Sequence, residues 1–281
     1  MKLTKLFLAV CLVAFLAIFA NIKTAYADGY LFISPQRVKL SDKSKVSSLH
    51  LVNKADVPKT YEINLVNYSM ENGKNLQIVD NMKHSAKDFI RFSPRRVTLG
   101  PNEDQYVRVM ARAPKDLEEG GYHVHIEFNE VENAHSKATS EGEKVDGDKV
   151  KFAVSAAYGV AIPIFVENGK TSANAKILNA DYSLKADGKS GELTAKFARE
   201  GNTTSYNLMT ITYIDKNGES HVAATPARLA IYRETDNIER TFALNLPEGV
   251  AFNGGEFKIT LSEIGTGDKV ELIDETRIPI R

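Results

Sequence analysis

The stretch from Val150 to Val166 constrains the fold of this chain more than any other, because apolar side chains occupy every second position along it. The apolar positions are the even-numbered ones: Val150, Phe152, Val154, Ala156, Tyr158, Val160, Ile162, Ile164 and Val166. A period of two predicts a β-strand with one buried face. About seventeen residues exceed the usual five or six of a strand, so we expect one end to serve more than pairing within its own domain.

The first 27 residues have the pattern of a cleavable secretory signal. Two lysines precede an apolar run from Leu6 to Ala20, and the small-residue pattern Ala25-Tyr26-Ala27 follows it. The alternative is a membrane anchor, but the cleavage pattern favours removal, which leaves a secreted protein that does not span the membrane. The only cysteine, Cys11, lies inside the apolar run, so the mature chain from Asp28 is expected to fold without disulfides.

The charge balance argues against a nucleic-acid partner. The chain has 36 basic and 36 acidic residues, and removing Lys2, Lys5 and Lys23 with the signal leaves 33 basic against 36 acidic, a net charge of about −3. A protein that binds nucleic acid normally shows a basic stripe or patch. No such stripe is visible in this sequence.

Short alternating segments separated by turn residues fill the rest of the chain, and no convincing amphipathic helix interrupts them. Seven such segments lie between Tyr30 and Glu132, and Pro35 and Pro94 fit the start or edge of a strand. A polar stretch from Asn133 to Lys149 precedes the long apolar strand and is expected to form a loop. The same pattern resumes after the turn at Glu167–Lys170, which predicts an all-β protein with sandwich domains at 28–168 and 169–281.

Several motifs of the first domain resemble those of periplasmic chaperones of the chaperone–usher pathway, in the order in which that family has them. They are Ile33-Ser34-Pro35-Gln36-Arg37-Val38, Leu51-Val52-Asn53 with Asp56-Val57-Pro58, Phe92-Ser93-Pro94 with Leu99-Gly100-Pro101, Gln105-Tyr106-Val107-Arg108-Val109, and Pro114-Lys115-Asp116-Leu117 leading to Tyr122. The segment Tyr158-Gly159-Val160-Ala161-Ile162-Pro163-Ile164 is similar to the divergent, archaic-type branch. The second domain matches more weakly, at Ala230-Ile231-Tyr232, Leu246-Pro247 and Gly254-Gly255.

The resemblance implies two immunoglobulin-like sandwiches in an L or boomerang arrangement, and a chaperone in the periplasm rather than an enzyme. Such a chaperone binds a pilus or fimbrial subunit by lending it a strand, then delivers it to an outer-membrane usher, without cofactor, metal or nucleotide. By position, the donated residues would be Val150, Phe152, Val154 and Ala156. The segment from Tyr158 onward would remain in the sandwich of the chaperone.

Members of this family usually bind the terminal carboxylate of the subunit with an Arg on the first strand and a Lys on the last. Arg37 matches the first of these positions, whereas Ala161 stands where the Lys is usual. Arg108 is the less favoured replacement for that missing cation, and Arg95 and Arg96 are others. The structural alternative for Arg37 is an ordinary solvated strand arginine.

His123, His125 and Glu127 lie two residues apart and would share one face of a strand. They could serve a metal-dependent enzyme, but no convergent further ligand is identifiable and no nucleophile motif is present. Because Val124, Ile126 and Phe128 form the apolar face, the two histidines are expected to face solvent, and no metal site is predicted.

Two other interpretations stay open at the level of the sequence. One is that Val150–Ala156 is a core strand of its own sandwich. The other is that the chain is a secreted two-domain adhesive or ligand-binding module with recognition on its loops. In a chaperone, by contrast, an exposed apolar edge favours a self-capping dimer in the unbound state.

Overall fold

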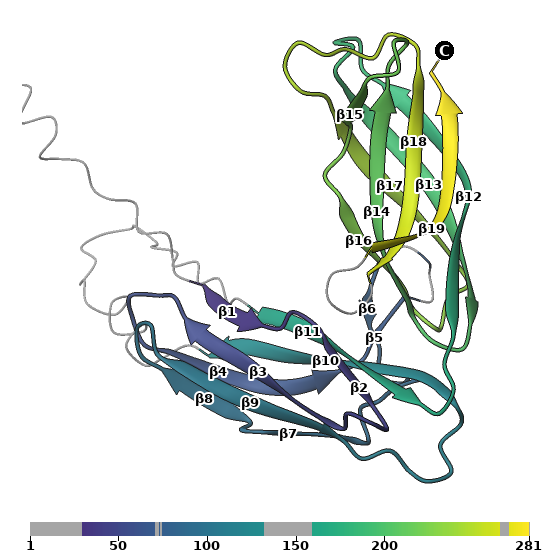
Figure 1. Cartoon of the computed structure of the whole chain (residues 1–281). Helices are drawn as coiled ribbons and strands as arrows, with labels where there is room; N and C mark the ends of the chain where they lie inside the picture. Colours follow the sequence, from purple (N-terminus) through teal and green to yellow (C-terminus); the bar gives the residue numbers. More distant parts are fainter. Residues whose placement is uncertain (1–29, 71–72, 74, 132–158, 265–269, 281) are drawn as a thin grey trace, which may run out of the picture.

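The computed structural model describes residues 30–70, 73, 75–131, 159–264 and 270–280, and every regular element in them is a β-strand. Figure 1 shows two elongated β-sandwiches joined in an L shape. The all-β, two-sandwich architecture expected from the sequence is therefore confirmed. The described part of the chain contains no helix with the length and apolar character needed to cross a bilayer.

The first sandwich packs a four-stranded sheet against a five-stranded one. The four-stranded sheet has the order β1 (Leu31–Ser34), β3 (Val46–Asn53), β9 (Asp104–Ala111), β7 (Ile90–Ser93). The five-stranded sheet has the order β2 (Val38–Ser41), β11 (Gly159–Asn168), β10 (Gly120–Val131), β4 (Lys59–Val66), β8 (Arg96–Leu99). The core between them includes Leu40, Leu49, Ile63, Val107 and Phe128, none more than 1% exposed.

Two prolines of the first domain each lie between two consecutive strands, which agrees with their expected place at the start or edge of a strand. Pro35 separates β1 from β2, and Pro94 separates β7 from β8. In both cases the two strands belong to different sheets. Proline has no backbone N–H for a ladder and fixes its own φ, so the chain leaves one sheet there and joins the other.

Strand β11 is the described part of the long apolar stretch. Its residues Ile162, Ile164 and Val166 are at most 4% exposed and face the core, as the alternation predicts. It pairs antiparallel with β10 and parallel with β2, where Ile164 lies opposite Val38. Its other face, which carries Phe165, is turned toward the second sandwich.

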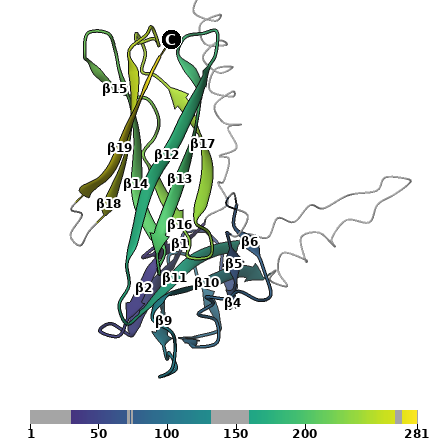
Figure 2. The same ribbon diagram turned by 90° about the vertical axis from the view of Figure 1, so that its right-hand side faces the viewer.

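The second sandwich is built from a three-stranded and a five-stranded sheet (Figure 2). The smaller sheet has the order β12 (Ala173–Leu184), β13 (Ser190–Gly201), β17 (Asn237–Asn245). The larger has β15 (Ser220–Val222), β14 (Ser205–Ile214), β18 (Glu256–Ile264) and β19 (Val270–Pro279), and β16 (Ala227–Ile231) also pairs with β14. Its core is centred on Phe197, Tyr213 and Phe257, each at most 1% exposed.

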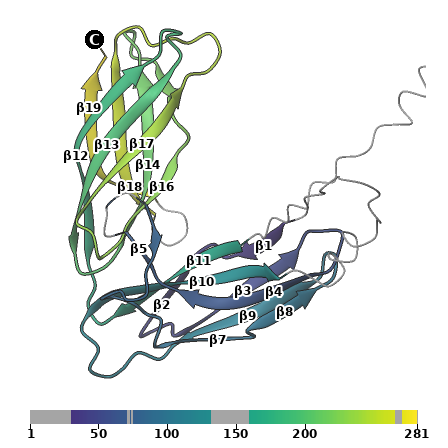
Figure 3. The same cartoon turned by 180° about the vertical axis from the view of Figure 1, so that it is seen from behind.

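A small hairpin connects the two cores. Strands β5 (Tyr68–Ser69) and β6 (Gln77–Ile78) pair antiparallel and lie between the two sandwiches (Figure 1). Figure 3 shows β5 there from behind. Met70, at the end of β5, is 5% exposed and packs within the hydrophobic core of the second sandwich. Arg240 of β17 donates a hydrogen bond of 3.1 Å to the carbonyl oxygen of Gly73. The hairpin therefore fixes the second sandwich against the first.

Candidate functional site

The inner angle of the L contains a cavity of about 600 Å³ that both sandwiches line. Its walls are β2 with the residue before it, the outer face of β11, the segment that joins the sandwiches, and the beginning of β14. Glu263 of β18 and Ile273 of β19 complete them. The lining residues are Arg37, Lys39, Phe165, Glu167, Thr171, Ser172, Ala173, Thr203, Thr204, Ser205, Tyr206, Asn207, Glu263 and Ile273. The set is mostly polar and holds two cations and two carboxylates.

Arg37 is the residue of this cavity that the sequence analysis singles out. It is half-buried immediately before β2, and its guanidinium carbon lies 3.8 Å from the ring centroid of Tyr206 in the second sandwich. No carboxylate of the described residues lies within ion-pair distance of Arg37. The N–H donors of a guanidinium in this position are free to bind an anion that enters the cavity.

Lys39 is a second cation in the cavity, and sequence reasoning did not find it. Lys39 lies on β2, two residues after Arg37, and lines the same cavity. Its ammonium lies 2.8 Å from Glu167 of β11, and its side chain is 64% exposed. The spacing Arg-Val-Lys is the signal in the sequence that could have indicated it.

The structure separates the other candidate cations from Arg37. Arg108 is exposed on β9, opposite Ser48 and Ser93, in the sheet that contains neither β2 nor β11. Arg95 lies over the ring of Phe92 at 5.3 Å, and Arg96 of β8 pairs with Glu62 at 3.3 Å.

Ala161 lies on β11, is exposed, and faces Glu127 of β10 across the ladder. The structure therefore places no cation at this position of the last strand, as the sequence requires.

The residues expected to be donated, Val150, Phe152, Val154 and Ala156, lie outside the described residues. The described ladder ends where that segment joins β11. The last pair between β10 and β11 is Asn129 with Gly159, and β10 continues for Glu130 and Val131, which pair with β4 on their other side.

The expectation that His123 and His125 face solvent is wrong. They are 1% and 4% exposed, because the second sandwich covers this face of β10. The alternation correctly assigned Val124, Ile126 and Phe128 to the core, where each is fully buried. It distinguished the two faces of the strand but held no information about what covers the outer one.

A buried polar cluster joins the two sandwiches at these histidines. His123 Nε2 lies 3.1 Å from a carboxylate oxygen of Glu234, and its ring lies 4.5 Å from that of Tyr232. The hydroxyl of Tyr232 lies 3.4 Å from His125 Nε2. The amide of Met70 donates to the other oxygen of Glu234 at 2.9 Å, so the carboxylate binds both β10 and the hairpin.

Burial sets the protonation of this cluster. Loss of water on burial lowers the pKa of His125 to about 3, with a smaller electrostatic contribution from His123, so the imidazole of His125 is neutral at pH 7. Burial alone would raise the pKa of the Glu234 carboxyl, but the hydrogen bond and charge of His123, with the Met70 amide, hold it below its usual value. The hydrogen bond from the Tyr68 hydroxyl to Glu127 is the main cause that raises the pKa of Tyr68 to about 12.

Among the described residues, the histidine pair is not part of a cluster that could hold a metal ion. Within the described ranges, the group whose ligand atoms all lie within 4.8 Å of one another is Asp215, Glu219 and His221, on the β14–β15 turn. Asp215 Oδ1 there already accepts the backbone N–H groups of Asn217 and Glu219. Neither His123 nor His125 belongs to this group.

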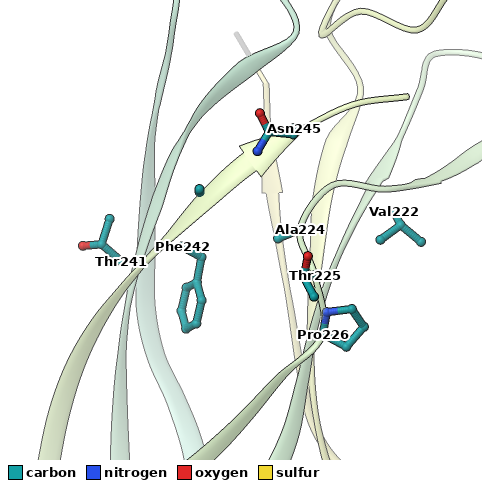
Figure 4. A pocket seen from close by; sticks show the side chains of 8 residues that line it. Val222, Ala224, Thr225, Pro226, Thr241, Phe242 and Asn245 are labelled. Atoms are coloured by element: carbon teal, nitrogen blue, oxygen red, sulfur yellow. The ribbon is translucent and has the colours of Figure 1, made fainter. Parts of the chain in front are cut away.

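A second cavity, of about 530 Å³, lies between the β15–β16 segment and β17 (Figure 4). Its lining residues are Val222, Ala224, Thr225, Pro226, Thr241, Phe242, Ala243 and Asn245. It holds no charged side chain and no group that titrates near neutral pH. The cavity between the sandwiches, with Arg37 and Lys39, is therefore the candidate site.

Fold and site together define a two-domain β-sandwich protein with a polar cavity between its domains, lined by two cations and two carboxylates. No protein-family model matches the chain, and no curated protein matches it. Similar solved structures include the CsuC–CsuE chaperone–tip adhesion subunit complex from the archaic Csu pili of Acinetobacter baumannii. That match has 12% identity and a TM-score of 0.48 over 88% of this chain and 97% of the other.

Two further matches are crystal structures of chaperones. The CupB2 chaperone of Pseudomonas aeruginosa matches with 8% identity and a TM-score of 0.44, over 89% of this chain and 100% of that one. The E. coli chaperone DraB matches with 13% identity and a TM-score of 0.43, over 90% of this chain and 96% of that one. At these identities the likeness concerns the fold, and no residue role is transferred.

Proposed function

We propose that this chain is a periplasmic chaperone that binds incompletely folded pilus subunits by strand donation and delivers them to an outer-membrane usher. The observation that carries this proposal is the position of Arg37, which lies in the cavity between the sandwiches without a carboxylate partner among the described residues. The first-domain motifs quoted above and the alternation of Val150–Ala156 also support it.

In this proposal the terminal carboxylate of the subunit binds Arg37, and Lys39 supplies the second cation that Ala161 cannot. Lys39 can exchange its contact with Glu167 for the incoming carboxylate, because its side chain is largely exposed. A hydrogen bond to a charged group contributes about 1.5–3 kcal/mol. Binding the chain end at a fixed point also sets register, since a slip of one residue would present Lys151, Ala153 and Ser155 in place of the apolar set.

The donated residues would be Val150, Phe152, Val154 and Ala156, which share their even numbering with the inward-facing residues of β11. A pilus subunit that lacks its last strand exposes an apolar groove, and an added strand fills that groove while its backbone extends the sheet. Burying one Val or Phe side chain contributes about 1.5–3 kcal/mol. Exchange for a better-fitting strand from the next subunit would drive release without a nucleotide.

Replacing Phe152 with Ser is expected to weaken binding to a coexpressed pilus subunit by about 10- to 100-fold, because one apolar side chain leaves the groove. Arg37→Ala is expected to weaken it by a similar factor, because one charge-assisted contact is lost. The measurement is the amount of soluble chaperone–subunit complex recovered from the periplasm, followed by titration of the purified complex.

Ser155→Ala and Arg108→Ala are the matched controls, since they lie at an odd-numbered position and on the opposite sheet, and both should bind as the unchanged chain does. Equal recovery of complex with Phe152→Ser and with Ser155→Ala would refute strand donation. Binding of a polysaccharide or host protein by the purified chain, with no effect on any subunit, would favour an adhesive module instead.

The free protein is expected to self-associate through its apolar donor segment, because an unpaired apolar strand tends to pair with another chain. Sedimentation velocity should show a dimer that dissociates when a subunit is added. Phe152→Ser should shift the free protein toward monomer. A strict monomer at all concentrations would contradict this expectation.

A further inference from the structure

Tyr206 is a residue of the second sandwich that touches the candidate anchor of the first. The guanidinium carbon of Arg37 lies over its ring, 3.8 Å from the centroid. Both side chains are half-buried and line the same cavity. This contact crosses from one domain to the other, and neither residue forms an ion pair with any described residue.

A guanidinium that lies over a ring face can still bind a carboxylate. The ring attracts the cation through its face, whereas the N–H donors of the guanidinium point outward in its own plane. A planar carboxylate binds in that plane through two parallel hydrogen bonds. Tyr206 can therefore fix the orientation of Arg37 without occupying the donors that the ligand needs.

The structure also holds the turn just before Tyr206 in place. This turn is fixed to β10 by a 2.8 Å hydrogen bond from the amide of Gly121 to the carbonyl oxygen of Asn202. The buried guanidinium of Arg199 donates to the carbonyl oxygens of Gly201 and Thr203 at 2.7 and 3.1 Å. A Cβ at Gly121 would overlap Thr203, so the turn lies directly against the first sandwich.

The strand that pairs with Tyr206 leads into the buried cluster between the domains. In the ladder Tyr206 lies opposite Ala230 of β16. Two residues later along that segment, Tyr232 packs on His123 and on Phe165, with ring centroids 4.5 and 5.8 Å apart. The position of the ring over Arg37 thus follows the packing of one sandwich on the other.

We propose that Tyr206 is a positioning residue for the carboxylate anchor, which makes that anchor a site shared by both domains. This inference rests on the proposed function and extends it, because it assigns to the second sandwich a role in recognising the end of the subunit. Tyr206 does not touch the carboxylate in this arrangement. It holds the guanidinium of Arg37 in the orientation that the carboxylate meets.

The test uses the full chain labelled with ¹⁵N and ¹³C at arginine, and N-acetylphenylalanine as a probe with a free carboxylate. Its amide, N-acetylphenylalaninamide, is the matched uncharged probe. In the unchanged chain the Arg37 side-chain protons should be shifted upfield by the ring, and the acid should move the Arg37 Nε–H signal saturably while the amide does not. Tyr206→Phe should bind the acid within about twofold of the unchanged chain, and Tyr206→Leu about three- to fivefold more weakly.

Arg37→Ala should lose most of the preference for the acid, since Lys39 is then the cation left in the cavity, and urea unfolding of each variant checks that it is folded. Equal affinity of the unchanged chain and folded Tyr206→Leu for the acid would overturn the role of Tyr206 while leaving Arg37 as the anchor. Arg37 side-chain protons without a ring-current shift in the unchanged chain would also overturn the role of Tyr206. An unchanged chain that does not prefer the acid over the amide would instead overturn the anchor in the proposed function, and the role of Tyr206 with it.

Discussion

The free energy of unfolding is expected to fall by up to about 5 kcal/mol as the pH is lowered from 6.5 to 3, because of His125. In the folded protein burial lowers the pKa of this imidazole to about 3, whereas an unfolded histidine has its ordinary value of 6.5. Below pH 6.5 the unfolded chain therefore binds a proton that the folded chain excludes. The contribution is fully present above pH 6.5 and decreases by about 1.4 kcal/mol for each pH unit below it.

The measurement is urea unfolding at a series of pH values between 7.5 and 4.5. The groups that face His125 are His123 on its own strand, Tyr68 of β5, and Tyr232 and Glu234 of the second sandwich. His125→Asn should remove most of the pH dependence in this interval, and His221→Asn, on the remote β14–β15 turn, should retain it. An unchanged slope in His125→Asn would refute the assignment.

Glu234→Ala is expected to destabilise the protein by about 3–5 kcal/mol, because it removes one partner of a buried pair. The side chain of Glu234 is 4% exposed, and that of its partner His123 is 1% exposed. The substitution also leaves the amide of Met70 without its acceptor. The measurement is the free energy of unfolding in urea at pH 7, with hydrogen exchange at the Met70 amide as a local readout.

Glu234→Gln is the conservative variant and should lose less than Glu234→Ala, because its amide oxygen can still accept from Met70. Glu239→Ala removes an exposed carboxylate that pairs with Lys196 at 3.4 Å, and should change the stability by at most about 1 kcal/mol. If Glu234→Ala and Glu239→Ala were equally mild, the buried cluster would contribute little to holding the sandwiches together.

Most of the fold followed from the period-two alternation, because that pattern records which face of each strand is buried. It assigned Val124, Ile126, Ile162 and Ile164 to the core correctly. It did not show where a strand changes sheets, since both halves of a strand divided at a proline keep the same pattern. It also did not show that a second sandwich covers His123, because the face of a strand that meets another domain can be as polar as one that meets water.

The site was predictable only where a local motif marks it. Arg37 was found from its neighbours along the chain, and it does line the cavity between the sandwiches. Lys39 was missed, although it lies two residues away, because the expected partner was sought on another strand. Tyr206 has no signal of its own, since only the packing of one domain on the other brings it to Arg37.

The burial of Met70 in the second sandwich has a consequence for the order in which this protein matures. That core is complete only when a side chain from the earlier half of the chain has been inserted into it. Since the earlier half is synthesised and emerges first, the hairpin is present before the strands that enclose it. A polypeptide that began at Gly169 would lack Met70 and leave a cavity in this core. Removing a large buried side chain typically lowers the free energy of unfolding by about 2–5 kcal/mol. The second sandwich therefore reaches its full stability only when Met70 of the hairpin is packed in its core.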